Sequence, residues 1–194
     1  TKPIFVIPFP IYLEEFLAES IKNKKNEVFT FGCSAAFFEH KNQALLIDAF
    51  YKAFGNSKNV QLLIHGRWGE EYDSLTKKIA TLNTDNIKII CKQLSHSEYL
   101  NFFKSLDCYV LISKGEGFSI TPREALAMGI PCILTDNTAH QTICKTGLVK
   151  AVKSKIEETA YFVPFGFECG HKFNCNLEDV VAALQEVYSN YDFY

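Results

Sequence analysis

The chain has 194 residues, 47% of them hydrophobic and 22% charged, which allows one domain with a sizeable core and excludes a disordered segment. Its formal net charge of −2 offers no positive field for a polyanion, which argues against nucleic acid as the main partner. The longest apolar runs, such as residues 108–112, are as long as a strand and fall far short of the roughly 20 residues that cross a bilayer. Seven cysteines without a paired framework, and no recognisable secretory signal, predict a cytoplasmic location.

Between residues 27 and 136, short β-rich runs alternate with longer segments of helical spacing, which is the pattern of repeated βαβ units. Each run is nearly all apolar, so both faces of each strand are expected to be covered, as in a parallel sheet. The pattern predicts an α/β fold, a Rossmann-like doubly wound parallel β-sheet with helices on both faces. The expected strands cover residues 28–31, 60–65, 87–91, 108–112 and 132–135, and the expected helices about 41–54, 70–82, 96–106, 122–128 and 177–189.

Two of these helices carry aromatic residues along one face. Because helical spacing alone explains such stripes, we interpret them as core and not as platforms for a cofactor. They are Ile47, Phe50, Tyr51 and Phe54 in the first helix, and Tyr99, Phe102, Phe103 and Leu106 in the third.

A sheet of this kind binds its ligand outside the carboxyl ends of its strands. The candidate functional residues are therefore expected in the loops that follow the strands. These loops cover about residues 32–41, 66–70, 92–96, 113–121 and 136–141.

The loop after the fourth predicted strand combines a helix start with two carboxylates. Thr121 at the N-cap, Pro122 at the first helical position and Glu124 at the third predict a capping box. The free amides and dipole of such a helix start attract phosphate, and Gly117 lets a ligand approach the backbone. Carboxylates accept hydrogen bonds from pairs of hydroxyls, so Glu116 and Glu124 suit a ligand with polyols on both sides of a diphosphate. The alternative is that Glu124 only caps its helix and Glu116 is a solvated loop residue.

The segment Glu116-Gly-Phe-Ser-Ile-Thr-Pro-Arg-Glu124, continued by Ala-Leu-Ala-Met-Gly-Ile-Pro131, resembles the signature of the retaining family-four glycosyltransferases of the GT-B fold, the glycosyl transferases group 1. Two glutamates separated by seven residues are the hallmark of that family. The similarity covers about residues 28–144 and includes Asp107, Ser113 and the segment His40-Lys41-Asn42.

The resemblance implies a role for each matching residue. Glu116 and Lys41 are expected to be catalytic, with Glu116 at hydroxyls of the transferred sugar and Lys41 at the departing diphosphate. Glu124 is expected to bind the ribose. The other substrate-binding candidates are Gly32, Cys33, Gly66, Arg67, Gln93, Leu94, Gly117, Phe118, Ser119, Thr121 and His140.

Some of these candidates carry alternatives. Cys33 stands where the family commonly has an Arg, and Arg67 in the neighbouring loop could supply that charge or be an ordinary surface Arg. Gln93 and Leu94 lie where the family reads the nucleotide base through backbone groups. His140 is expected to border the sugar pocket, unless it is an ordinary buried or surface histidine.

By the same resemblance, residues 1–12 are the remnant of an interdomain linker and residues 13–194 form a single nucleotide-sugar-binding domain. This domain is expected to bind a UDP-, GDP- or ADP-sugar without a cofactor or metal, and to be inactive alone. A sugar or lipid-linked acceptor would bind a missing N-terminal domain. The whole enzyme would transfer the sugar to an acceptor hydroxyl with retention, in bacterial-type cell-surface glycan synthesis such as that of lipopolysaccharide or capsule. Peripheral association with the inner face of the membrane stays open.

Two other functions remain. One is a nucleotide-sugar isomerase or epimerase, and the other is a degenerate, non-catalytic nucleotide-sugar-binding module, which the departure at Cys33 makes conceivable. A dinucleotide-dependent dehydrogenase is disfavoured, because the Gly-x-Gly-x-x-Gly pattern is absent after the first predicted strand. The cluster of Cys169, His171 and Cys175 matches no common zinc spacing, and we expect a loop with incidental thiols there.

Overall fold

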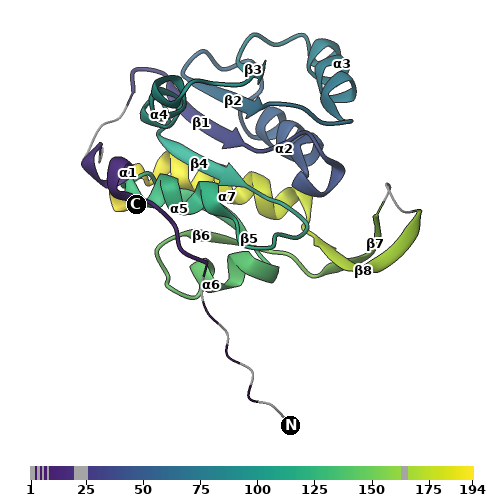
Figure 1. Cartoon of the computed structure of the whole chain (residues 1–194). Helices are drawn as coiled ribbons and strands as arrows, with labels where there is room; N and C mark the ends of the chain where they lie inside the picture. Colours follow the sequence, from purple (N-terminus) through teal and green to yellow (C-terminus); the bar gives the residue numbers. More distant parts are fainter. Residues whose placement is uncertain (1–2, 4, 6, 8, 20–25, 163–165) are drawn as a thin grey trace.

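The computed structural model describes residues 3, 5, 7, 9–19, 26–162 and 166–194. Within them, six parallel strands form one sheet in the order β3-β2-β1-β4-β5-β6 (Figure 1). This arrangement confirms the predicted Rossmann-like α/β fold, and the order reverses between β1 and β4. The strands are β1 Phe29–Ser34, β2 Val60–Gly66, β3 Ile87–Cys91, β4 Cys108–Leu111, β5 Cys132–Asp136 and β6 Lys150–Lys153.

The helices cover both faces of the sheet (Figure 1). On one face lie α2 (Gln43–Phe54), α3 (Tyr72–Leu82) and α7 (Leu177–Ser189), and on the other lie α1 (Glu14–Ala18), α4 (His96–Lys104), α5 (Ile120–Ala127) and α6 (Gln141–Cys144). Short 3-10 turns, η1 (Glu39–Lys41) and η2 (Thr138–His140), precede α2 and α6, and η4 (Tyr191–Phe193) follows α7. No helix in these described ranges is both long and apolar enough to cross a membrane.

The core forms where the apolar strands meet the aromatic faces of the helices. All six residues of β1 are buried, as expected for a central strand covered on both sides. The Phe31 ring stacks on Phe54 of α2 at 5.7 Å, and Tyr188 of α7 meets Phe54 edge-on at 5.4 Å. The predicted core role of the first aromatic face is therefore confirmed for Phe50 and Ile47, whose exposure is 0%.

A β-hairpin projects from the sheet beyond β6 and was not predicted from the sequence (Figure 1). It consists of β7 (Ile156–Phe162) and β8 (Phe167–Asn174), paired antiparallel with a bulge between Thr159 and Tyr161. Its base is tied to the body, because the Phe173 amide donates to the Lys114 carbonyl at 2.7 Å and Lys114 Nζ pairs with Glu158 at 2.8 Å. The hairpin thereby supports the loop after β4.

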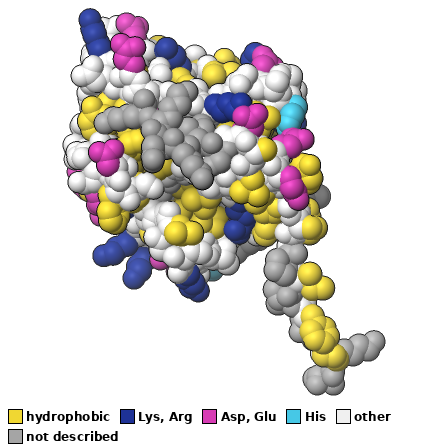
Figure 2. All heavy atoms as spheres, turned by 90° about the vertical axis from the view of Figure 1, so that its left-hand side faces the viewer, with side chains coloured by type: hydrophobic (Ala, Val, Ile, Leu, Met, Phe, Trp, Pro, Cys, Tyr) yellow, Lys and Arg dark blue, Asp and Glu magenta, His cyan; other side chains and the backbone are white. Residues whose placement is uncertain are grey.

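Three described residues near the start of the chain have exposed hydrophobic side chains, and exposed hydrophobic atoms stand out from the body in Figure 2. Phe5, Ile7 and Phe9 are 79%, 83% and 63% exposed. The Phe9 ring also meets the Phe118 ring edge-on at 5.6 Å. The predicted boundary between a linker at 1–12 and a domain at 13–194 stays a prediction, and residues 1, 2, 4, 6 and 8 lie outside the described residues.

Candidate functional site

The carboxyl ends of β1 and β4 separate at the point where the strand order reverses, which is where doubly wound sheets bind ligands. Tyr109 of β4 is buried beneath this point. Its hydroxyl lies 2.7 Å from Thr121 Oγ1 and 3.1 Å from the Ser34 carbonyl oxygen. One tyrosine therefore joins the end of β1 to the start of α5.

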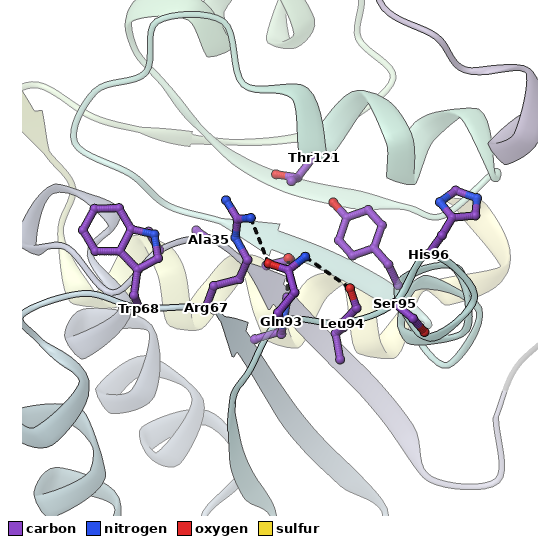
Figure 3. Close-up of a pocket in the computed structure, with 13 residues that line it drawn as sticks. Ala35, Arg67, Trp68, Gln93, Leu94, Ser95, His96 and Thr121 are labelled. Atoms are coloured by element: carbon purple, nitrogen blue, oxygen red, sulfur yellow. Dashed lines mark hydrogen bonds between the residues drawn. The ribbon is translucent and has the colours of Figure 1, made fainter.

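A cavity of about 530 Å³ opens between the ends of β1, β2 and β3 and the first turns of α4 and α5 (Figure 3). Its volume lies within the usual range for a small-molecule site. Trp68 and Arg67 stand at one end and His96 at the other (Figure 3). The cavity is lined by Ser34, Ala35, Ala36, His65, Gly66, Arg67, Trp68, Gln93, Leu94, Ser95, His96, Tyr99 and Thr121.

The cavity brings together five residues that the sequence predicted from three separate loops. Gly66, Arg67, Gln93, Leu94 and Thr121 all line it. Arg67 Nη1 donates to Gln93 Oε1 at 2.9 Å, and Gln93 Nε2 donates to the Leu94 carbonyl at 3.3 Å (Figure 3). Arg67 thus places a guanidinium at the cavity, whereas Trp68 and His65 were not among the predicted residues.

The two residues predicted to be catalytic contact each other, and neither of them lines the cavity. Lys41 Nζ lies 2.7 Å from Glu116 Oε1, and their side chains are only 18% and 9% exposed. Lys41 comes from η1 and Glu116 from the loop after β4, so the pairing depends on the fold. Each charge is balanced by the other in the free chain, and an incoming anion or polyol would have to compete for it.

The amides of Gly117, Phe118 and Ser119 make no hydrogen bond to any other residue in the described part of the chain. Ser119 has φ of 61°, in the left-handed region that non-glycine residues rarely adopt. Its side chain turns inward, where Ser119 Oγ lies 2.7 Å from His140 Nε2. The backbone donors of this loop are therefore left for a ligand, while the Ser119 hydroxyl is not.

His140 is fully buried, which agrees with the alternative of a buried histidine, and it does not line the cavity. A place for His140 beside the sugar stays a prediction. Thr135 Oγ1 donates to the Ser113 carbonyl at 2.7 Å, so it can only accept from His140 Nδ1 at 3.3 Å. We infer that Nδ1 carries the proton and that Nε2 accepts from Ser119. Burial lowers the pKa of His140 to about 4, which keeps the ring neutral.

The predicted capping box at Thr121 and Glu124 is wrong. Helix α5 begins at Ile120, with Ser119 as the N-cap and no side-chain cap. Tyr109 approaches the Thr121 hydroxyl, and the Tyr99 hydroxyl donates to Glu124 Oε2 at 2.7 Å. Both side chains of the presumed box are thus engaged by tyrosines from other elements, and Glu124 has no capping role in this structure.

Tyr99 packs against the core, as predicted, and also lines the cavity, which was not predicted. It lies in the first turn of α4, whose start is fixed by a capping box between Ser95 and Glu98. The sequence offered one signal for this role, since Tyr99 follows the third predicted strand at the start of a helix. First-turn residues of helices that follow strands lie at the edge of the sheet where the ligand binds. Phe103 of the same stripe is fully buried, as predicted.

Gly32 and Cys33 are also corrected. Strand β1 continues to Ser34, so both residues lie within the sheet and not in the loop after it. The Cys33 side chain is 1% exposed, and burial raises the pKa of its thiol to about 12. The side chain of Leu106 covers Gly32, and neither residue lines the cavity. No direct contact with a ligand follows for either residue.

Two glycines at the site differ in the space around them. A Cβ at Gly66 would lie 2.5 Å from the Ala35 carbonyl oxygen and 2.7 Å from the Phe37 ring, whereas a Cβ at Gly117 would meet nothing within 4 Å. We expect Gly66→Ala to lower the free energy of unfolding by about 1–3 kcal/mol, because backbone must shift to make room. Gly117→Ala is the matched control and should unfold like the original chain. Urea denaturation of both variants tests this, and equal stabilities would contradict it.

No group of three or more His, Cys, Asp or Glu residues in the described ranges is arranged to hold a metal ion. Of the cysteine cluster, Cys169 and His171 lie on the exposed strand β8, where His171 Nδ1 lies 2.8 Å from Glu157 Oε1. The polar groups described above are amides, carboxylates and cations, which suit an anionic ligand that also carries hydroxyls.

Comparison with known proteins relates this site to one family. Residues 15–159 match the family model for glycosyl transferases group 1. An uncharacterized glycosyltransferase of Methanocaldococcus jannaschii is 31% identical over 134 residues, 69% of this chain and 30% of that protein. The lipopolysaccharide core biosynthesis mannosyltransferase LpsB of Rhizobium meliloti is 32% identical over 76 residues, 35% of this chain and 22% of that protein.

The fold is shared with solved glycosyltransferases. The pneumococcal O-GlcNAc transferase GtfA, in complex with UDP and GlcNAc, has a TM-score of 0.63 and 16% identity, covering 89% of this chain and 31% of that one. The chain spans less than a third of the length of each of these relatives. The family match extends over most of the sequence and includes both glutamates and Lys41, and on this ground the chain belongs to the glycosyl transferases group 1 family.

Proposed function

We propose that this chain binds the nucleotide-sugar donor of a glycosyltransferase. The observation that carries the proposal is the Lys41–Glu116 pair, held at 2.7 Å beside the free amides of Gly117, Phe118 and Ser119. These groups provide a cation and backbone donors for a diphosphate, and a carboxylate for sugar hydroxyls. The cavity at the ends of β1, β2 and β3 has room for the nucleoside.

In this proposal, donor binding exchanges the partners of the ion pair. Lys41 turns from Glu116 to the diphosphate, and Glu116 accepts hydrogen bonds from the sugar. When the bond between the sugar and the diphosphate breaks, negative charge grows on the departing diphosphate. Lys41 and the amides of Gly117, Phe118 and Ser119 stabilise that charge, an effect that is larger in a closed cleft than in water.

We further propose that the whole protein transfers the sugar to an acceptor hydroxyl with retained anomeric configuration, in cytoplasmic synthesis of a cell-surface glycan. The lipopolysaccharide core mannosyltransferase among its relatives supports the glycan class. UDP in the pneumococcal transferase supports a uridine nucleotide as the first donor to test. No cofactor or metal takes part in this proposal.

Titration calorimetry of the chain with uridine, guanosine and adenosine diphosphates tests donor binding. We expect one of them to bind and its sugar conjugate to compete for the same site. If the folded chain binds none of the three, the chain is a degenerate module and the proposal fails. Incubation of the whole protein with a labelled nucleotide sugar separates transfer from isomerisation, because only transfer moves the label to an acceptor.

A further inference from the structure

Tyr99 contributes a hydroxyl to the site from a helix that the family motif does not include. Its oxygen donates to Glu124 Oε2 at 2.7 Å, across 25 residues of sequence. The ring is held from two sides, with Phe103 at 5.1 Å and Phe16 at 6.3 Å, both in edge-to-face contact. The Tyr99 side chain is therefore anchored in the core at its ring, and Tyr99 is one of the residues that line the cavity.

We propose that Tyr99 is a positioning residue that orients the Glu124 carboxylate toward the ribose hydroxyls of the donor, a role that rests on the proposed function. A carboxylate has two oxygens, and Tyr99 occupies Oε2. Glu124 has no other side-chain hydrogen bond within the described residues, so Oε1 is left to accept from a ribose hydroxyl.

The charge states of the two groups agree with this role. Burial raises the pKa of Glu124, and the hydrogen bond from Tyr99 opposes that rise. Burial and the neighbouring Glu124 charge raise the pKa of Tyr99, so its hydroxyl stays protonated and donates. Loss of the hydroxyl should therefore let Glu124 take up a proton at a higher pH, and a protonated carboxyl accepts less well from ribose.

Other charged groups surround the pair. His65 of β2 meets the Tyr99 ring at 6.4 Å, and burial lowers the pKa of His65. Arg67 lies on the loop after β2, Arg123 lies on α5 over the Phe118 ring, and Glu15 of α1 pairs with His96 at 2.5 Å. Tyr99→Phe changes none of these groups. Their effects on the pKa of Glu124 therefore cancel when the variant is compared with the original chain.

The test compares Tyr99→Phe with the original chain in binding of uridine diphosphate and of its 2′,3′-dideoxy analogue, which lacks the ribose diol. If the calorimetry with the three nucleoside diphosphates shows that the chain binds guanosine or adenosine diphosphate instead, that nucleotide and its dideoxy analogue are used in place of the uridine compounds. We expect the variant to bind the diphosphate roughly fivefold more weakly at neutral pH and the dideoxy analogue unchanged. On acidification, the affinity of the variant for uridine diphosphate should also begin to fall at a higher pH than that of the original chain.

Two further variants separate positioning from packing. Tyr72→Phe removes a hydroxyl from a partly buried tyrosine that packs on Phe37 outside the cavity, and should leave both affinities unchanged. In Glu124→Ala, which leaves no side-chain acceptor for the Tyr99 hydroxyl, the additional change Tyr99→Phe should have no effect on binding of the diphosphate. Equal loss for the diphosphate and the dideoxy analogue, or no loss for either, overturns the inference. If the original chain binds no nucleoside diphosphate, the proposed function has failed first and the role of Tyr99 falls with it.

Discussion

Replacement of Lys41 by methionine is expected to weaken binding of a nucleoside diphosphate by roughly 10- to 100-fold, the value of one or two hydrogen bonds to a charged group. Methionine keeps most of the side-chain volume but removes the ammonium that would contact the diphosphate. Titration calorimetry at low and moderate salt measures the loss. An unchanged affinity would show that Lys41 does not meet the diphosphate.

The same substitution should destabilise the free chain, since it leaves the Glu116 carboxylate without its partner. Both side chains are largely covered, at 18% and 9% exposure, so we expect a loss of about 1–3 kcal/mol in the free energy of unfolding. Adding Glu116→Gln should recover most of this stability but none of the affinity. That contrast separates binding from folding.

Lys78 provides a matched control for the Lys41 experiment. It pairs with Asp48 at 2.6 Å between α3 and α2, away from the cavity, with side chains 31% and 40% exposed. Lys78→Met should change stability by less than about 1 kcal/mol and leave nucleotide affinity unchanged, because an exposed ion pair contributes little. Glu116→Gln alone should bind a nucleoside diphosphate at least as tightly as the original chain, since it frees Lys41 from its competitor.

His140 is expected to make the stability of the chain depend on pH. Its pKa is about 4 in the folded chain, against 6.5 for an unburied histidine. Between these values the unfolded chain binds more protons than the folded chain, so the free energy of unfolding rises with pH through this window. His140 alone should contribute about 3 kcal/mol, present in full above pH 6.5 and lost as the pH falls toward 4.

Urea denaturation of the original chain and of His140→Gln at several pH values measures this contribution. Glutamine can still accept from Ser119 but does not titrate, so the difference in stability between the two should shrink as the pH falls. His65 and His40 also have pKa values lowered by burial, and some pH dependence should therefore persist in the variant. Parallel curves for His140→Gln would refute the role of His140.

The predictable part of the fold has a common physical basis. The first five strands are continuous apolar runs and the main helices have apolar faces, and both signals are local in the sequence. Strand β6 has a single buried residue, Val152, and β8 has none, so neither carried an apolar pattern that could be recognised. The hairpin is held instead by contacts of its base with the loop after β4.

The candidate site likewise has a part that could be predicted from local sequence patterns and a part that depends on contacts between distant residues. The sequence by itself predicted that the ligand-binding groups lie in loops at the carboxyl ends of the strands, and it proposed Lys41, Glu116 and Glu124 as the charged groups. Only the tertiary structure decided their partners. Lys41 meets Glu116 across 75 residues, Tyr99 meets Glu124 across 25, and Ser119 meets His140 across 21. A local pattern such as the apparent capping box at Thr121 and Glu124 fails when a tyrosine from another element takes the same oxygen, because polar side chains bond to whatever donors the folded chain places beside them.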